Sequence, residues 1–146
     1  MKNVSLVISC GGAKGLVGIG VIEELERRGY NIQSVAGTSI GSVILGIYAS
    51  GNLNEYKEWM LKQGRIDILR LMDFTLNKQG IIKGKKVFEE MKPFFKDSLI
   101  ENLPIPYSAV AADINSFQEI VFEKGSLHHA IRCSISVPSL ITPVIS

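Results

Sequence analysis

The chain has few of the residues that hold small secreted or metal-binding proteins together. Only two of its 146 residues are cysteines, Cys10 and Cys133. Two thiols so far apart in sequence form neither a disulfide framework nor a zinc site, and we interpret both as reduced, mostly buried side chains. Reduced thiols are typical of a reducing compartment. The sequence therefore indicates no metal and no cofactor, and it favours a cytoplasmic location.

Long apolar runs and strong charge are also missing. Residues 4–9 form an apolar run that is too short for the core of a secretory signal, and nothing reaches the roughly 18 apolar residues of a membrane span. The net charge of +2 is too small to argue for nucleic acid. We expect a soluble protein without a nucleic-acid partner, and peripheral contact with a membrane surface stays open.

The composition is that of an ordinary globular domain. Hydrophobic residues make up 46% and charged residues 21% of the chain, which fits one domain over residues 1–146 with a single buried core. Residues 144–146 are apolar and strand-like, and such a tail normally pairs with a neighbouring strand. We therefore expect the natural domain to continue past Ser146.

Short β-branched runs alternate with helix-like stretches along the first 50 residues. The pattern predicts strands at 4–9 and 33–36 and helices at 16–28 and 40–50, which is the start of a parallel sheet with helices packed on it. Further along, it predicts helices at 54–63, 85–95 and 126–134 and a hairpin of strands 107–114 and 118–123. The expected N-cap residues are Asn52 or Asn54 for the third helix and Ser126 for the last one.

A serine stands at the turn between the second predicted strand and the second predicted helix. The sequence Gly37-Thr38-Ser39-Ile40-Gly41 is a G-x-S-x-G pattern. In this setting a sharp turn exposes the serine hydroxyl at the carboxyl edge of the sheet, and the following helix points its positive end at the site. Ser39 is therefore a candidate nucleophile, and the alternative interpretation is a simple helix N-cap.

A glycine-rich turn lies one strand–helix unit upstream. Residues 10–15 read Cys-Gly-Gly-Ala-Lys-Gly, and consecutive glycines let backbone N–H groups converge on an anion. Two such donors near Ser39 would form an oxyanion hole, the set of donors that stabilises negative charge during acyl transfer. The candidate donors and their neighbours are Gly11, Gly12, Ala13, Lys14 and Gly15.

The same turn fits a nucleotide-binding loop poorly. A P-loop needs Gly-Lys-Ser/Thr in that order, but here Lys14 precedes Gly15 and Leu16 follows. A dinucleotide-binding fingerprint needs an acidic residue near the end of the second strand, and residues 35–37 are Val-Ala-Gly. Both differences disfavour nucleotide binding.

Several stretches resemble the patatin-like phospholipase family. They are LVISCGGAKG, GVIEELERRGY, VAGTSIGS and AADINSFQEIVFEKGSLHHAIRCSISVPSLITPV, which together span most of the chain. The resemblance implies a three-layer α/β/α fold with a largely parallel sheet. It also implies a lipid acyl hydrolase of the phospholipase A or lysophospholipase type, with Ser39 as nucleophile and residues 10–15 as oxyanion loop. Such enzymes use a Ser–Asp dyad, without histidine or metal, on phospholipids and other acyl-ester lipids.

Two positions depart from the family pattern. The first loop glycine of the family is Cys10 here, which would strain the backbone if this position required a positive φ. The catalytic aspartate of the family lies in an Asp-Gly-Gly or Asp-Gly-Ala motif after the segment SVPSLITPV, and this chain ends before it. We therefore expect the general base after Ser146. We also expect the 146-residue chain to be weak or inactive, while a longer version hydrolyses lipid esters.

Two alternatives remain open. Ser39, Asp113 and either His128 or His129 follow the chain order of an α/β-hydrolase triad, although both histidines fall on a predicted helix. The chain could instead be a non-catalytic lipid- or partner-binding pseudoenzyme, because the aspartate is missing and Cys10 replaces a glycine.

A basic and apolar segment follows the third predicted helix. Its members are Phe74, Lys78, Ile81, Ile82, Lys83, Lys85 and Lys86. This combination could form a lid that contacts a membrane over the site. The alternative is a set of core residues with solvated lysines around them.

Overall fold

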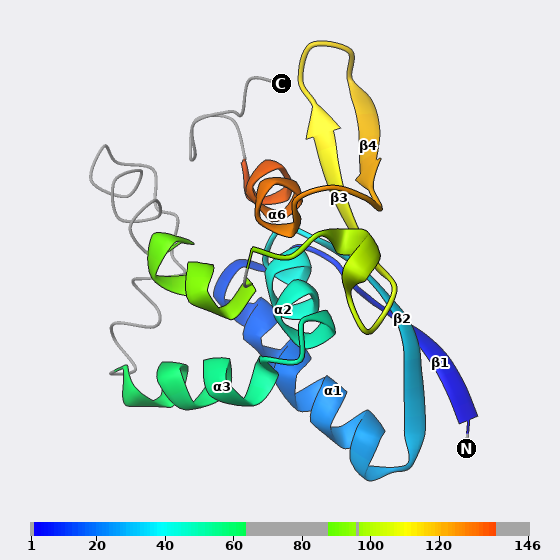
Figure 1. Ribbon diagram of the computed structural model, residues 1–146, viewed down its shortest axis with the longest axis vertical. Coiled ribbons are helices and arrows are strands. Elements are labelled where there is room, and N and C mark those ends of the chain that lie inside the picture. Colours follow the sequence, from blue (N-terminus) through cyan, green and yellow to red (C-terminus); the bar gives the residue numbers. More distant parts are fainter. Residues whose placement is uncertain (1, 64–87, 96, 137–146) are drawn as a thin grey trace.

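The computed structural model describes residues 2–63, 88–95 and 97–136 of the chain (Figure 1). Helices and strands alternate along the first half, as the periodicity predicts. The named elements are β1 (Lys2–Ile8), η1 (Gly12–Leu16), α1 (Val17–Arg27), β2 (Tyr30–Thr38), α2 (Ile40–Ala49), α3 (Leu53–Lys62), η2 (Ile100–Asn102), β3 (Tyr107–Asp113), β4 (Gln118–Phe122) and α6 (Leu127–Ile135). Residues 88–95 form a further helix.

The four described strands form one sheet in the order β1-β2-β3-β4. Strands β1, β2 and β3 are parallel, and β4 returns antiparallel to β3. The register pairs Ile8 with Gly37 and Thr38 with Val110. The carboxyl ends of β1 and β2 therefore meet at one edge of the sheet, where the two glycine-containing turns follow. This arrangement confirms the predicted α/β fold with a largely parallel sheet.

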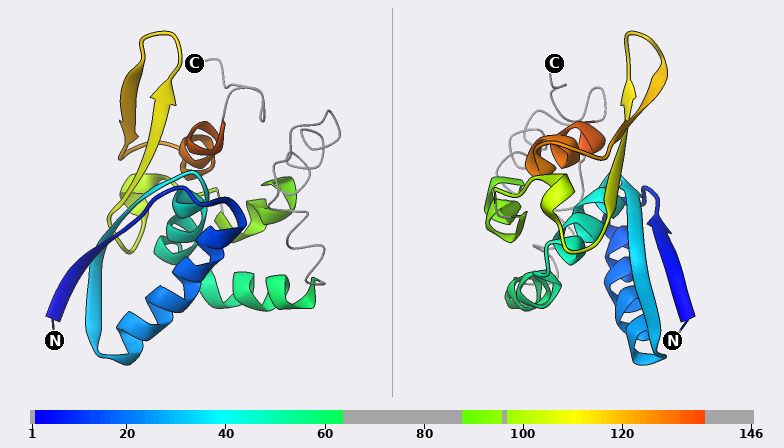
Figure 2. Two further views of the ribbon diagram at one scale, coloured as in Figure 1. Left: turned by 180° about the vertical axis from the view of Figure 1, so that it is seen from behind. Right: turned by 45° about the vertical axis from the view of Figure 1, so that its right-hand side comes forward.

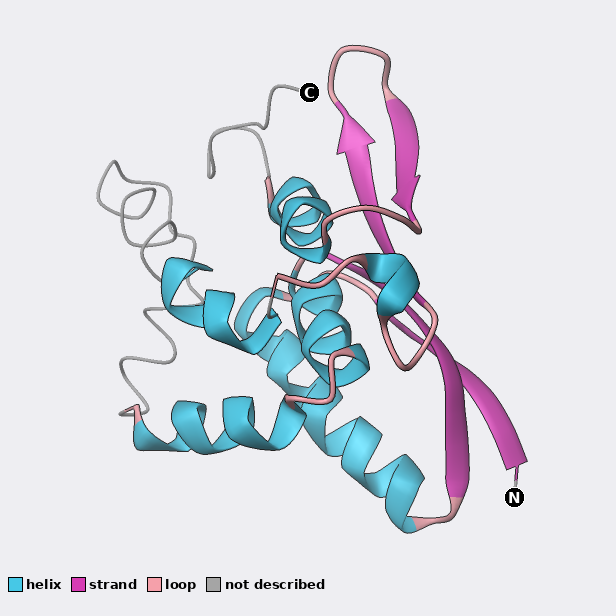
Figure 3. Ribbon diagram, viewed as in Figure 1, coloured by secondary structure: helices cyan, strands magenta, loops and turns pink. Residues whose placement is uncertain are grey.

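The described helices cover one face of this sheet (Figures 2 and 3). Helices α1, α2 and α6 pack directly on the strands. The opposite face of β1 and β2 carries polar contacts, such as the hydrogen bond from Ser34 Oγ to Ser5 Oγ at 2.7 Å. Val7 on that face is 71% exposed. The described helices thus form a single layer on one face of the sheet.

Helix α2 forms the centre of the core. It is apolar almost all round, and every residue from Ile40 to Ala49 except Tyr48 is buried. Gly46 lets α6 approach closely, because a Cβ atom there would lie 2.7 Å from Ile131 Cδ1. Because α2 is packed on all sides, its first residue, Ile40, has a fixed position, and Ser39 directly precedes it.

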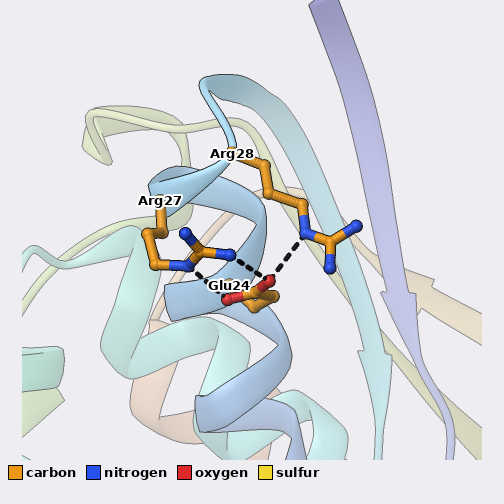
Figure 4. A network of polar contacts seen from close by, with 3 residues as sticks. All are labelled: Glu24, Arg27 and Arg28. Atoms are coloured by element: carbon orange, nitrogen blue, oxygen red, sulfur yellow. Dashed lines mark hydrogen bonds and ion pairs between the residues drawn. The ribbon is translucent and has the colours of Figure 1, made fainter.

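Charged side chains gather at the other end of α1 (Figure 4). Arg27 donates to both carboxylate oxygens of Glu24 at 2.6 and 2.7 Å, and Arg28 Nε donates at 2.6 Å. These hydrogen bonds lower the pKa of Glu24 from 4.5 to about 2, and the largest contribution comes from Arg27. Gly29 then ends the helix with a φ of 77°, a conformation that glycine commonly supplies at this position. The network lies on the surface, far along α1 from the glycine-rich turn.

Most sequence-based boundaries agree with the structure. The hairpin is confirmed, and the Ser126 hydroxyl accepts from the His129 N–H at 3.2 Å as an N-cap. Strand β2 is longer than predicted. Asn52 is not a side-chain cap, because its Nδ2 donates instead to Phe94 O at 2.8 Å. The lid segment and the strand-like tail lie outside the described residues.

Candidate active site

Ser39 occupies a strained backbone conformation between β2 and α2. Its φ is 54° and its ψ is −127°. Apart from Ser39, only Phe117 among the described non-glycine residues has a positive φ. An L-residue keeps such a conformation only where its surroundings enforce it, and residues of this kind cluster at functional sites. The half-buried serine is therefore presented at the carboxyl edge of the sheet, where the G-x-S-x-G pattern predicts it.

The flanking glycines are needed for close packing. A Cβ atom at Gly37 would lie 2.5 Å from the carbonyl carbon of Gly41. A Cβ atom at Gly41 would lie 2.0 Å from Ile8 O, the backbone at the end of β1. Neither glycine has a positive φ. The positive φ of this motif is at Ser39 itself. The motif thus places small residues where strand and helix touch and puts the strain on the serine.

Hydrogen bonds fix the backbone of Ser39 on both sides. Its carbonyl accepts from the Ser42 N–H at 2.9 Å, the Val43 N–H at 3.3 Å and the Ser42 hydroxyl at 2.6 Å. Its own N–H donates to Ser134 Oγ at 2.9 Å. Because this N–H is already engaged, it is not a donor for an oxyanion. Within the described part of the chain, nothing accepts from the Ile40 N–H, which lies at the positive end of α2.

The glycine-rich turn is built differently. Gly11 is extended, with a φ of −175°, and Gly12 has a φ of 52°. The Lys14 N–H donates to Gly11 O at 3.1 Å, which starts the short helix η1. A Cβ atom at Gly15 would lie 2.2 Å from Ile40 Cγ2. The loop therefore rests directly on the residue that follows Ser39, and the structure brings the two predicted parts of the site together.

Cys10 fits its position without backbone strain. The expectation of a buried thiol is wrong here, because Cys10 is exposed. It forms no disulfide, and its φ is not in the left-handed region. The glycine that the family pattern has here is thus not required by backbone conformation. An apolar groove of about 470 Å³ adjoins this side of the loop, and its lining includes Val17 and Val21. These two valines are 69% and 41% exposed.

The alternative triad is not assembled in this structure. The Asp113 carboxylate accepts from the Asn115 N–H at 2.9 Å and the Ser116 hydroxyl at 2.7 Å, which keeps its pKa below the usual value. His129 Nε2 lies 3.5 Å from Cys133 Sγ. No hydrogen bond joins Ser39 to any described carboxylate or imidazole.

His128 lies apart from the turn as well. Its ring lies 4.8 Å from that of Phe88, centroid to centroid. Burial is the main cause that lowers the pKa of this imidazole. The packing therefore indicates that His128 is a neutral side chain between two helices and not a partner of the Ser39 hydroxyl.

Residues 2–63, 88–95 and 97–136 contain neither a metal cluster nor a membrane-spanning helix. No cluster of three or more His, Cys, Asp or Glu side chains there is placed to bind a metal ion. None of the helices in these ranges has both the length and the apolar character that a bilayer span requires.

Sequence reasoning did not single out Ser134. This residue lies on α6, and its hydroxyl contacts the Ser39 backbone across 95 residues of sequence. It falls inside the stretch that resembles the patatin-like family, but no spacing rule marks one serine in CSIS above the other. Only the fold shows which serine reaches the turn.

The fold and the turn at Ser39 place the chain among α/β proteins with a serine at a strand–helix turn. Within that class, the patatin-like phospholipase family model matches residues 6–146. The chain therefore belongs to the patatin-like phospholipase family, as the sequence resemblance implies.

Similar proteins come from bacteria and mammals. An NTE family protein of Mycobacterium tuberculosis is 40% identical over 141 residues, covering 97% of this chain and 39% of the relative. A second NTE family protein of that organism is 33% identical, covering 98% of this chain and 24% of the relative. Patatin-like phospholipase domain-containing protein 6 of Mus musculus is 31% identical, covering 98% of this chain and 11% of the relative. The chain thus spans well under half the length of these relatives.

Proposed function

We propose that this chain carries the nucleophile and the oxyanion loop of a serine hydrolase that cleaves acyl-ester lipids. The observation that supports this most strongly is the conformation of Ser39, which has a φ of 54° at the turn between β2 and α2. The packing of Gly15 against Ile40 supports it further, because it places residues 10–15 beside that serine. A simple N-cap serine would need neither feature, and the Ser39 side chain makes no cap hydrogen bond.

The reaction is acyl transfer in two steps. The Ser39 hydroxyl oxygen attacks the ester carbonyl carbon while a general base takes its proton, and the ester bond to the alcohol breaks as that alcohol receives the proton. Water then attacks the acyl-serine and releases the fatty acid. The N–H groups of Gly11 and Gly12 and of Ile40 are the donors for the oxyanion, since the Ser39 N–H is bonded to Ser134.

The general base is proposed to be a carboxylate from a part of the polypeptide outside the described residues. No described carboxylate or imidazole is hydrogen-bonded to Ser39. The resemblance to the family supports an aspartate that follows the segment SVPSLITPV, and the relatives are longer than this chain. We rank the α/β-hydrolase triad below this dyad, because Asp113 is engaged in its own turn.

The proposed substrate class is a phospholipid or another acyl-ester lipid. Membership of the patatin-like phospholipase family supports it. The apolar groove beside residues 10–15 offers an apolar surface next to the proposed oxyanion loop. Peripheral contact with a membrane would bring such a substrate to the site, and it belongs to the same proposal.

A fluorophosphonate probe tests the nucleophile directly. We expect covalent labelling that maps to Ser39 and is lost in Ser39→Ala. Ser50→Ala is the matched control, because it removes a hydroxyl at the far end of α2 whose one partner among the described residues is Gly46 O, at 2.8 Å. Labelling that persists in Ser39→Ala would refute this assignment.

Comparing two chain lengths tests the base. A chain extended past Ser146 should hydrolyse a fluorogenic acyl ester about 10²–10⁴-fold faster than residues 1–146, which is the usual contribution of a general base. Equal rates would contradict the proposal. Lipid binding by the extended chain without labelling of Ser39 would instead favour the pseudoenzyme.

A further inference from the structure

We propose that Ser134 is a positioning residue, which holds the Ser39 backbone in the conformation that presents the nucleophile. This inference rests on the proposed function of Ser39. Ser134 lies near the end of α6, is only 8% exposed and reaches the turn from a segment distant in sequence. It does not touch the reacting atoms, so its effect on the chemistry passes through the Ser39 main chain.

The direction of the two hydrogen bonds fixes the Ser134 hydroxyl. Its oxygen lies 2.6 Å from Val110 O, which can only accept, so the single hydroxyl proton points there. A lone pair of the same oxygen then faces the Ser39 N–H at 2.9 Å. The hydroxyl is therefore a directed link between the backbone of β3 and the backbone of Ser39, which a methyl group cannot replace.

A positive φ at Ser39 requires support on both sides of the residue. On the carbonyl side, Ser42 supplies both its N–H and its hydroxyl. That side is braced again, because the Tyr107 hydroxyl donates to Ser42 O at 2.9 Å. On the N–H side, Ser134 is the only described group that accepts from Ser39. Without it, the N–H loses its partner and the strained turn can relax.

The same bond has a consequence for the oxyanion. It directs the Ser39 N–H toward α6, so the donors that face a substrate come from the loop and from the start of α2. The Thr38 hydroxyl also donates to Val110 O, at 3.0 Å. Val110 O thus accepts from two side-chain hydroxyls, one at the end of β2 and one on α6, and both bonds tie β3 to the turn at Ser39.

Ser134→Ala tests the link, with Ser136→Ala as the matched control. The control removes the same atom from the same end of α6, where the Ser136 hydroxyl donates to Arg132 O at 2.6 Å and does not touch the turn. The first measurement is hydrogen exchange of the Ser39 amide, read by NMR. We expect exchange to be faster in Ser134→Ala and unchanged in Ser136→Ala, with similar melting temperatures for the two variants.

The second measurement is the rate of fluorophosphonate labelling, separated into probe affinity and maximal rate. We expect Ser134→Ala to lower the maximal rate by about tenfold, which corresponds to the loss of one hydrogen bond that holds the Ser39 main chain, and to leave probe affinity unchanged. Ser134→Thr keeps the hydroxyl and should restore most of the rate. If Ser134→Ala does not fold, Ser134→Cys keeps the shape with a weaker acceptor and should give a smaller change in the same direction.

The two measurements separate this inference from the function on which it rests. Unchanged exchange of the Ser39 amide in Ser134→Ala would overturn the link, whatever the probe does. Faster exchange with an unchanged labelling rate would overturn the positioning role. A wild-type chain that the probe never labels, in either length, would overturn the proposed hydrolase, and the exchange measurement would still decide whether Ser134 sets the turn.

Discussion

The turns that follow β1 and β2 are neighbours with the same strand-to-helix topology, yet they are held in opposite ways. In the first turn the positive φ falls on Gly12, and the loop is largely exposed. In the second turn it falls on Ser39, whose backbone is bonded to Ser42, Val43 and Ser134. A glycine adopts this conformation without cost, whereas for serine the strain is of order 1–3 kcal/mol. The first turn takes its place by packing, and the second is forced into shape by hydrogen bonds.

This difference suits the two proposed roles. A nucleophile has to point in one direction, so the backbone that carries it is held by hydrogen bonds from distant parts of the chain. Backbone donors for an oxyanion need room for the substrate, so their loop has few side chains and rests on the anchored turn through Gly15 and Ile40. The position of the loop therefore depends on the turn at Ser39, and the following substitutions test that dependence.

Gly41→Ala should have the largest effect, because it breaks the contact between the two turns at the backbone. The added Cβ would lie 2.0 Å from Ile8 O, and neither atom belongs to a flexible side chain. We expect a loss on the order of 4 kcal/mol or more in the free energy of unfolding, measured by urea denaturation.

Gly20→Ala is the control for the same chemical change. Gly20 lies inside α1, and a Cβ there would meet nothing within 4 Å. This variant should gain about 0.5–1 kcal/mol from the better helix propensity of alanine. Equal stability of the Gly41→Ala and Gly20→Ala variants would show that Gly41 is not needed for packing.

Gly15→Ala should have the next largest effect, because it lifts the loop off the second turn. Its Cβ would lie 2.2 Å from Ile40 Cγ2, and overpacking of this kind typically costs about 1–3 kcal/mol. We expect lower stability and slower fluorophosphonate labelling of Ser39. The double variant Gly15→Ala/Ile40→Ala removes the clash, so it should be more stable than the sum of the single changes predicts, by about 1 kcal/mol. Additive effects would mean that the two residues do not touch in solution.

Cys10→Gly should change little, because the first turn does not need a glycine at its start. Cys10 is exposed and has no positive φ. We expect a stability change below about 1 kcal/mol, from the greater backbone freedom of glycine, and an unchanged rate of Ser39 labelling. A labelling rate that rises about tenfold would show instead that the thiol obstructs the proposed oxyanion loop.

The sequence predicted the positions of both turns but not the way in which the second is held. The residue pattern was enough for β1, α1 and α2. The first is a short apolar run, the second has apolar residues at helical spacing, and the third is apolar almost all round, and a glycine follows each of them closely. The pair of turns followed, since parallel strands bring their carboxyl ends to one edge. The link from Ser134 to Ser39 joins residues 95 positions apart, and it depends on how α6 packs against β3. No local pattern contains that information.

The glycines of the G-x-S-x-G pattern illustrate the same limit. Their spacing indicates a tight turn, and a positive φ at a glycine is the usual reason for one. The structure puts the positive φ on Ser39 and assigns Gly37 and Gly41 to contacts between backbones. A close approach between two segments is a property of the assembled fold, so the sequence could indicate close packing at these glycines but not the backbone atoms that they meet.

Glu24→Gln should have the smallest effect, and it tests whether charge at the far end of α1 influences the loop. The folded-state pKa of Glu24 is about 2, below its ordinary value of 4.5. Because the pKa of Glu24 is lower in the folded state than in the unfolded state, the ionised carboxylate stabilises the fold at pH values above 4.5. This stabilisation is lost as the pH falls from 4.5 toward 2. The melting temperatures of wild type and Glu24→Gln should therefore differ slightly at neutral pH and converge in acid. Because the carboxylate and both arginines are exposed, salt should reduce the difference. Labelling of Ser39 should stay at the wild-type rate, since the loop is held by glycine packing at the other end of the helix, and a slower rate would show that the ionic network helps to place it.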